Sequence, residues 1–405
     1  MTNAMPALLA LLLVFSLPAM AVSAANPSAA GSHVDERYEA TTVQSVEPTA
    51  LDGTTNRLEL TGETRTDTVD YSTTLGTELA TADDELRSEY DRYTILDHEF
   101  DEATSDEQIS MIRSAREYVQ NRTNELEDRS HTAAAAHANN EISSEQFIQK
   151  LIRNHNEANS LADTIDEIDD KEDQILGYSI DLTEDEHRLD MQQGSVRSLA
   201  DGTTQETATG QTIEIETSEN GYQLETIVDD TYVVETTRFD NRDRDGWDEF
   251  DETIDAFHHT EDLYPWAAED GETSFRDRNE DPANFYHAEI SHSQGVLSTF
   301  LDSNSGEIYH EVQELSLDSL PISETTTETD NGLVLTHNET PSNGPIEIIV
   351  NDSESDDPVE SATVSIDGIE AGETDDEGTI WLLPPDEEYT VEVEANGGEV
   401  ELTIP

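Results

Sequence analysis

The chain lacks cysteine and is almost without lysine. Without thiols it cannot form disulfides, bind zinc through thiolates or carry a lipid on a lipoprotein cysteine. Lys150 and Lys171 are the only lysines, and 94 Asp and Glu residues against 19 Lys and Arg give a formal net charge of −75 over 405 residues. This charge argues strongly against binding to DNA, RNA or anionic lipid, because those partners need a positive surface.

The excess of acidic residues indicates a salt-loving organism. In dilute buffer such a chain repels itself, whereas at molar salt the Debye length shrinks to about 3 Å and the acidic surface becomes tolerable. Hydrophobic residues make up 34% of the sequence, enough for two or three small cores rather than one large one.

The only long apolar run is Ala7 to Val22, and it is followed closely by small residues of the kind a signal peptidase recognises. We therefore predict a secretory signal peptide over residues 1–24 and a flexible segment over 25–55. An uncleaved membrane anchor is the alternative, although the run is short and contains Pro18. Beyond this segment we expect no contact with a membrane.

Helical periodicity dominates from Leu75 to Ile175, and we predict a helical bundle domain over residues 56–200. Ser105, and either Ser143 or Ser144, provide the expected helix starts. A short strand is predicted over 57–61. The first helix is expected to bury one apolar stripe, formed by Leu75, Leu79, Ala82, Leu86, Tyr90, Tyr93, Leu96 and Phe100.

After Gly202 the apolar residues alternate, which is typical of strands. Asn220-Gly221 predicts a tight hairpin turn, and a short helix is expected around Phe250 to Leu263. Residues 201–316 should therefore form an α+β domain with an antiparallel sheet. Residues 317–344 are interpreted as a polar linker and 345–405 as a small β-sandwich. The predicted fold class is multi-domain α+β, with a helical bundle, a central α+β domain and a C-terminal sandwich.

Three stretches resemble known families. The first comprises TNRLELTGETRTDTVDYSTTLGTELATADDELRSEYDRYTILDHEF, AREYVQNRTNELEDR and NNEISSEQFIQKLIRNHNEA, and it resembles the N-terminal helical domain of secreted haloarchaeal glycoproteins of unknown function. The run FYHAEISHSQGVLSTFLDSNSGEIYHEV is similar to the closing strands of PepSY-type domains. TDDEGTIWLLPPDEEYTVEV resembles the transthyretin-like sandwich of carboxypeptidase regulatory domains. These resemblances imply extracytoplasmic binding or spacer modules and bring no catalytic residue.

One loop, NRDRDGWDEFDE, fits the twelve-residue calcium-loop pattern, in which alternate oxygens converge because a glycine permits a sharp turn. Gly246 occupies the turn position, and Asp248 stands where an aliphatic residue is usual. We predict calcium as the ligand, or else a solvated acidic turn. The proposed ligands are Asn241, Asp243, Asp245, Trp247 through its carbonyl, Glu249 and Glu252.

Asn-X-Ser/Thr triplets predict glycosylation at Asn121, Asn338 and Asn351. The sequence carries no recognisable nucleophile, phosphate-loop or metalloprotease motif. We therefore expect a secreted, non-enzymatic envelope or surface protein whose partner is another envelope or secreted protein. The alternative is an enzyme regulator, such as a PepSY-like protease inhibitor, or an enzyme with an unrecognised site.

Overall fold

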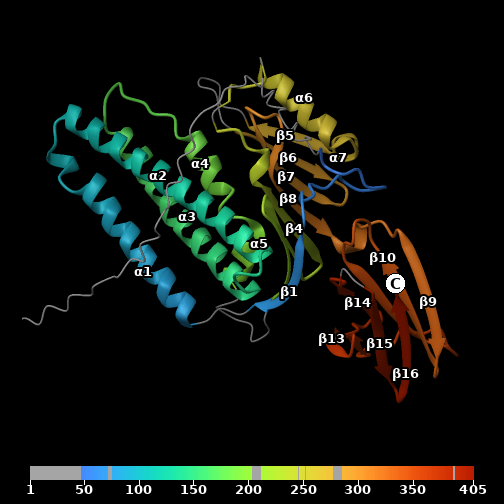
Figure 1. Ribbon diagram of the computed structural model, residues 1–405. Helices are drawn as coiled ribbons and strands as arrows, with labels where there is room; N and C mark the ends of the chain where they lie inside the picture. The colour runs from blue at the N-terminus through green and yellow to red at the C-terminus, as the bar shows by residue number, and fades with distance from the viewer. Residues whose placement is uncertain are drawn as a thin grey trace, which may run out of the picture. The chain divides into compact units, whose positions relative to one another are not determined.

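The computed structural model describes residues 47–71, 75–202, 211–244, 246–250, 252–276, 285–385 and 388–405, with side chains omitted at 75–78, 201–202, 211 and 276 (Figure 1). These residues belong to the unit Ser45–Pro405. The predicted signal peptide and most of the predicted flexible segment lie outside them. The structure confirms the multi-domain α+β class, with helices first, antiparallel sheet next and small sheets at the end. Within the described residues no helix is both long and apolar enough to span a membrane.

An eight-stranded antiparallel sheet forms the centre of the fold, in the order β1-β2-β3-β4-β8-β7-β6-β5. The predicted hairpin between β2 and β3 is confirmed, although the turn residues are Glu219 and Asn220, and Gly221 is the first residue of β3. The strands are β1 (Arg65–Tyr71), β2 (Gln211–Ser218), β3 (Gly221–Val228), β4 (Thr231–Arg238), β5 (Glu272–Arg276), β6 (Phe285–His292), β7 (Gly295–Asp302) and β8 (Ile308–Ser316).

The N-terminal helices are α1 (Leu75–Arg92), α2 (Ser105–Ala138), α3 (Ser144–Glu172), α4 (Thr183–Asp190) and α5 (Ser195–Gly202). Capping boxes start the two long helices: Thr104 pairs with Glu107 at α2, and Ser143 pairs with Gln146 at α3. α2 and α3 share a buried seam that includes Val119, Leu126 and Leu161. The predicted packing of these two helices is therefore confirmed.

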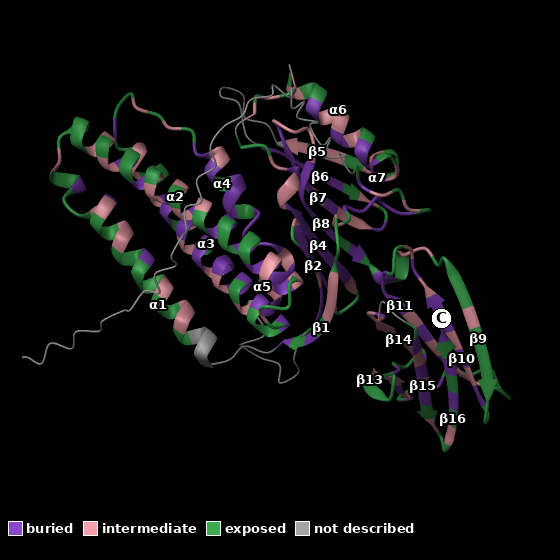
Figure 2. Ribbon diagram, viewed as in Figure 1, coloured by how far each residue is buried: buried purple, intermediate pink, exposed green. Residues whose placement is uncertain are grey.

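The prediction that α1 buries its leucine and tyrosine stripe is wrong. Leu79, Leu86, Tyr90 and Tyr93 are 64%, 67%, 67% and 54% exposed, and of the stripe members whose side chains are described only Leu96 and Phe100, beyond the helix, are buried (Figure 2). Polar contacts hold α1 against α3, chiefly the ion pair between Arg153 and Asp84. Helical spacing shows that residues share a face, but it does not say which face meets the neighbouring helix.

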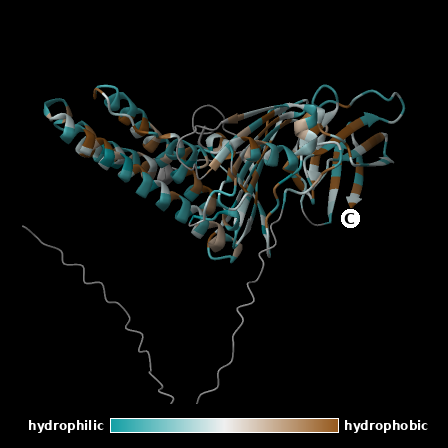
Figure 3. Cartoon of the chain, turned by 90° about the horizontal axis from the view of Figure 1, so that it is seen from above, coloured by the Kyte–Doolittle hydropathy of each residue, from teal (hydrophilic) through white to brown (hydrophobic). Residues whose placement is uncertain are grey.

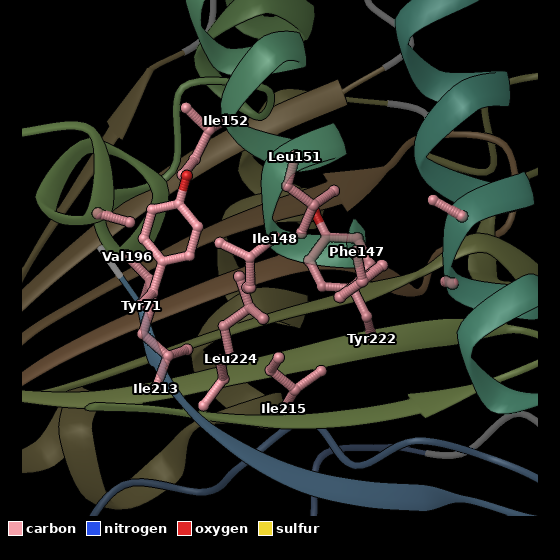
Figure 4. Close-up of a cluster of buried hydrophobic side chains, with 14 of the residues drawn as sticks. Tyr71, Phe147, Ile148, Leu151, Ile152, Val196, Ile213, Ile215, Tyr222 and Leu224 are labelled. Atoms are coloured by element: carbon pink, nitrogen blue, oxygen red, sulfur yellow. The ribbon is translucent and has the colours of Figure 1, made fainter. Parts of the chain in front are cut away.

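Helices and sheet share one core across the predicted boundary between a helical domain (56–200) and an α+β domain (201–316). Side chains of α3, including Phe147, Ile148 and Leu151, pack on β1, β2 and β3 against Ile213 and Leu224 (Figure 4). Strand β1 comes from within the predicted helical domain and pairs with β2 along its whole length. Its sequence RTDTVDY has few apolar residues, so it gave no strand signal.

The other face of the sheet is partly covered by α6 (Thr253–Leu263), which confirms the predicted short helix, and by α7 (Pro265–Asp270). A third apolar cluster joins these helices to β6, β7 and β8 and includes Leu58. The strand predicted over 57–61 is absent: the described chain makes a single bridge there, between Thr49 and Arg57.

The C-terminal β-sandwich is confirmed, but it begins inside the predicted linker. Its two sheets have the orders β14-β11-β10-β9 and β13-β12-β15-β16, and they enclose a separate apolar cluster. β9 has the sequence ETTTETD and lies exposed at the edge of its sheet. Its threonines favour a strand, but it contains no apolar residue, so the sequence shows no apolar alternation there. The strands are β9 (Glu324–Asp330), β10 (Leu333–Glu339), β11 (Ile346–Asp352), β12 (Thr363–Ile366), β13 (Ile369–Glu373), β14 (Thr379–Leu382), β15 (Tyr389–Ala395) and β16 (Gly398–Ile404).

Hydrophilic residues make up much of the length of the helices (Figure 3).

A matched pair of leucine substitutions tests the position of α1. Leu161→Ala in the buried seam should lower the free energy of unfolding by about 2–5 kcal/mol, because it leaves a cavity. Leu86→Ala on the exposed stripe should change it by less than about 0.5 kcal/mol. Chemical denaturation at molar salt measures both, and equal losses would mean that α1 packs through its apolar face after all.

Candidate functional site

The predicted calcium loop folds against the turn between β7 and β8. Asn241 is buried and its side-chain amide donates to the carbonyl of Ile308 at 2.7 Å. The amide of Glu249 donates to the carbonyl of Ser303, and Asn304 donates to the carbonyl of Asp243. These hydrogen bonds hold Asn241, Asp243 and Glu249 against the turn between β7 and β8.

The structure does not show the remaining predicted ligands held on this turn. Trp247 is 90% exposed, Glu252 precedes α6, and Asp245 lies outside the described residues. Asp248, which departs from the pattern, accepts hydrogen bonds from the Phe250 amide and the Tyr286 hydroxyl. Within the described part of the chain, no three acidic or histidine side chains form a group able to hold a metal ion.

The three predicted glycosylation positions differ in accessibility. Asn121 is exposed on α2, and Asn351 is half-buried in β11. Asn338 is 9% exposed in β10, and its side chain donates to Glu347 and accepts from Thr325. The side chain of Asn338 is therefore held within the sheet, and glycosylation at the three positions stays a prediction.

A second candidate site was not predicted: a polar hollow of about 320 Å³ over β1, β2 and β3. We call it the carboxylate recess. Cross-strand pairing places Glu214 opposite Glu225 and Glu216 opposite Gln223, so these side chains share one face of the sheet. The recess is lined by Arg57, Glu59, Leu60, Gly62, Thr64, Thr66, Glu214, Glu216, Gln223, Glu225, Ser342 and Asn343.

Two of its four carboxylates are held well below the protein surface. Glu214 and Glu225 are 8% and 5% exposed. Glu225 accepts a hydrogen bond of 2.6 Å from Gln223 and another from the Tyr232 hydroxyl. Thr236 in turn donates to Gln223, so β3 and β4 fix the orientation of these groups.

Arg57 is the one basic residue among the described residues that line the recess. Its guanidinium lies 5.4 Å from the centre of the Tyr232 ring and 3.8 Å from Glu225, and it donates to the carbonyl of Ser342. Burial works against its charged form, but the acidic groups of Tyr232, Glu225 and Glu311 outweigh burial and raise the pKa of Arg57.

Glu311 extends this polar network across β8. It is 1% exposed and accepts hydrogen bonds from the Leu58 amide, Gln313 and the Tyr264 hydroxyl. Burial raises the pKa of the Glu311 carboxyl, although these hydrogen bonds oppose the shift. The network therefore concentrates carboxylate oxygens around a single guanidinium.

The sequence contained a weak signal for this recess. Glutamates alternate in QTIEIETS, the β2 sequence, which reads as the solvent face of a half-buried strand. Nothing local shows that the segment carrying Arg57 lies over that face, because this contact joins residues far apart in the chain. In a sequence this acidic, neighbouring carboxylates alone do not indicate a functional site.

Replacing Arg57 tests how strongly the fold depends on this cation. Arg57→Met should lower the free energy of unfolding by about 3–5 kcal/mol, because it leaves buried carboxylates without their guanidinium. Arg87→Met is the control, since Arg87 forms an exposed pair with Asp83 whose loss should cost less than about 1 kcal/mol. Denaturation at molar salt compares them, and equal effects would contradict a structural role for Arg57.

Comparison with known proteins finds three family matches. A domain of unknown function (DUF7096) matches residues 1–212, and a family of unknown function (DUF7094) matches 213–321. An archaeal fibronectin-III type-like domain matches 324–402, where the sequence resembled a transthyretin-like sandwich. Its start at 324 agrees with β9 as the first strand of the sandwich.

No curated protein and no solved structure matches the chain. The matches describe an archaeal multi-domain protein, and no PepSY-type domain is among them. Because the first match spans more than half of the 405 residues, the chain belongs to the family defined by the domain of unknown function DUF7096.

Proposed function

We propose that this chain is a secreted, non-enzymatic interaction protein of the cell envelope of a halophilic archaeon. The observation that carries the proposal is the separation of charge. Arg188, Arg197 and Arg238 are buried in ion pairs, whereas Glu399 and Glu401 stand exposed on β16. Such a surface stays hydrated and repulsion is screened at molar salt.

Two further features support the same proposal. The apolar N-terminal run has the character of a secretory signal, and the C-terminal fibronectin-III-like domain is a separate sandwich with its own core. The helix-and-sheet body then carries the binding surfaces, and the sandwich acts as a spacer or a second binding module.

Fractionation of a haloarchaeal culture at molar salt tests this proposal. The tagged full-length chain should appear in the medium or the envelope fraction together with envelope proteins, and a chain lacking residues 1–24 should remain in the cytoplasm. Recovery of the full-length chain from the cytoplasm would contradict secretion. A stoichiometric complex with a secreted protease would instead indicate an enzyme regulator.

We also propose that the loop from Asn241 to Glu252 binds calcium. The supporting observation is Asp302 on the facing turn, which is 1% exposed and whose Oδ2 has no hydrogen-bond partner among the described residues. Burial raises the pKa of Asp302, so a cation beside it would restore the charged form. Oxygen-rich loops of this kind suit a hard cation.

Terbium luminescence tests the calcium proposal. Terbium added at molar salt should give emission sensitised by Trp247, and calcium should displace it. Glu252→Gln with Asp245→Asn should abolish the emission, whereas Glu328→Gln with Asp330→Asn, an equal charge change on the exposed strand β9, should leave it intact. Emission that survives the first pair would show that the loop is only a charged connection.

A further inference from the structure

The outer face of α1 carries a row of apolar side chains that no other part of the described chain covers. Leu79, Leu86, Tyr90 and Tyr93 are between 54% and 67% exposed, and Ala82 lies exposed between the two leucines. We call these five residues the outer stripe. Single exposed apolar residues are common on protein surfaces, but a continuous row of this length on one helix marks an interaction surface.

The opposite, polar face of α1 holds it against α3. Asp84 accepts a hydrogen bond of 2.7 Å from Arg153 of α3, and Ser88 is buried on the same side of α1. At about 100° per residue, Asp84 and Ser88 lie roughly half a turn away from Leu86. The helix is therefore amphipathic in the reverse sense, because its polar face meets the bundle and its apolar face meets solvent.

The outer stripe is symmetric about Leu86. Ala82 and Tyr90 stand four residues on either side of it, and Leu79 and Tyr93 stand seven residues on either side. A two-fold axis at this point brings a second α1, running in the opposite direction, against the first, with Leu86 facing Leu86. Ala82 then faces Tyr90 of the second copy, so a small side chain meets a large one. Leu79 faces Tyr93 in the same way.

We infer that the outer stripe is the contact surface of an antiparallel homodimer, in which α1 of one copy packs along α1 of a second copy. Burial of the stripe in both copies removes on the order of 1000 Å² from water, the size at which a specific protein interface becomes stable. The contact uses the same surface of each copy and closes on itself, so it gives a dimer rather than a filament. It does not depend on secretion or on calcium binding, so it stands or fails separately from the proposed function.

The charges beside the stripe fit this arrangement along one of its two edges. Asp83 and Arg87 form an exposed ion pair of 3.1 Å there. The two-fold axis brings this edge against itself, so Asp83 of each copy lies next to Arg87 of the other. The second edge carries Glu85 and Glu89, which are exposed and come close to the same residues of the second copy. Molar salt screens their repulsion, so we expect the dimer under those conditions.

Disulfide cross-linking tests the arrangement directly, because the unmodified chain has no cysteine. Leu86→Cys should give a covalent dimer on oxidation at molar KCl, since the two-fold axis brings the two positions together. Leu176→Cys, at another exposed leucine, is the matched control and should stay monomeric. Leu79→Cys alone should also stay monomeric, because its two copies lie about 21 Å apart in an antiparallel pair. A mixture of Leu79→Cys and Tyr93→Cys should cross-link.

Sedimentation equilibrium of the full-length chain at molar KCl measures the association itself. Leu86→Asp should weaken dimerisation at least about tenfold, because both copies lose the central apolar contact. Leu176→Asp should leave it unchanged. Glu89→Lys should strengthen it, because the new cation lies beside Glu85 of the second copy, whereas Glu399→Lys, an equal charge change on the exposed strand β16, should have no effect. Circular dichroism at a dilution where the chain is monomeric checks that each variant folds.

Three results would overturn the inference. They are a chain that stays monomeric over the whole concentration range, a Leu86→Cys variant that cross-links no faster than Leu176→Cys, and a Leu79→Cys variant that cross-links with itself. If Leu86→Cys were joined to a different protein of the envelope fraction instead, the stripe would belong to that partner and the homodimer would be wrong.

Discussion

Compensation of buried acids by a small supply of arginines is the constraint on which the rest of this structure depends. Glu127 on α2 is 1% exposed, and it receives Arg188 from α4 and Arg242 and Arg244 from the segment after β4. A buried carboxylate without such partners would cost several kcal/mol. The pairs thus tie the long helix to the segment that leaves the sheet.

The same constraint explains why helices and sheet form one body. Arg197 of α5 pairs with Glu235 of β4, and both side chains are almost completely buried. Next to this pair, the apolar side chains of α3 cover the sheet, so ionic and apolar contacts act across the same boundary. A domain boundary near residue 200 would cut through both.

Local sequence patterns predicted most helices and strands, but they did not predict which of these elements pack or pair with one another. The hairpin of β2 and β3, the long helices and five of the six strands after Pro345 follow from turn chemistry and periodicity, which are local. The orientation of α1, the pairing of β1 and the recess depend on contacts between distant segments. The acidic composition adds to the difficulty, because an exposed strand such as β9 and a partly buried row such as Glu214 and Glu216 both appear as polar alternation.

The recess follows the same constraint with a single arginine. Arg57 faces the buried Glu225, and it is the one basic side chain among the described residues that line the recess. The hydrogen bonds from Gln223 and Tyr232 hold Glu225 in place, so the charge is oriented as well as buried. The Tyr232 ring also lies 5.4 Å from the Arg57 guanidinium, so one side chain of β4 positions both members of the pair between Arg57 and Glu225.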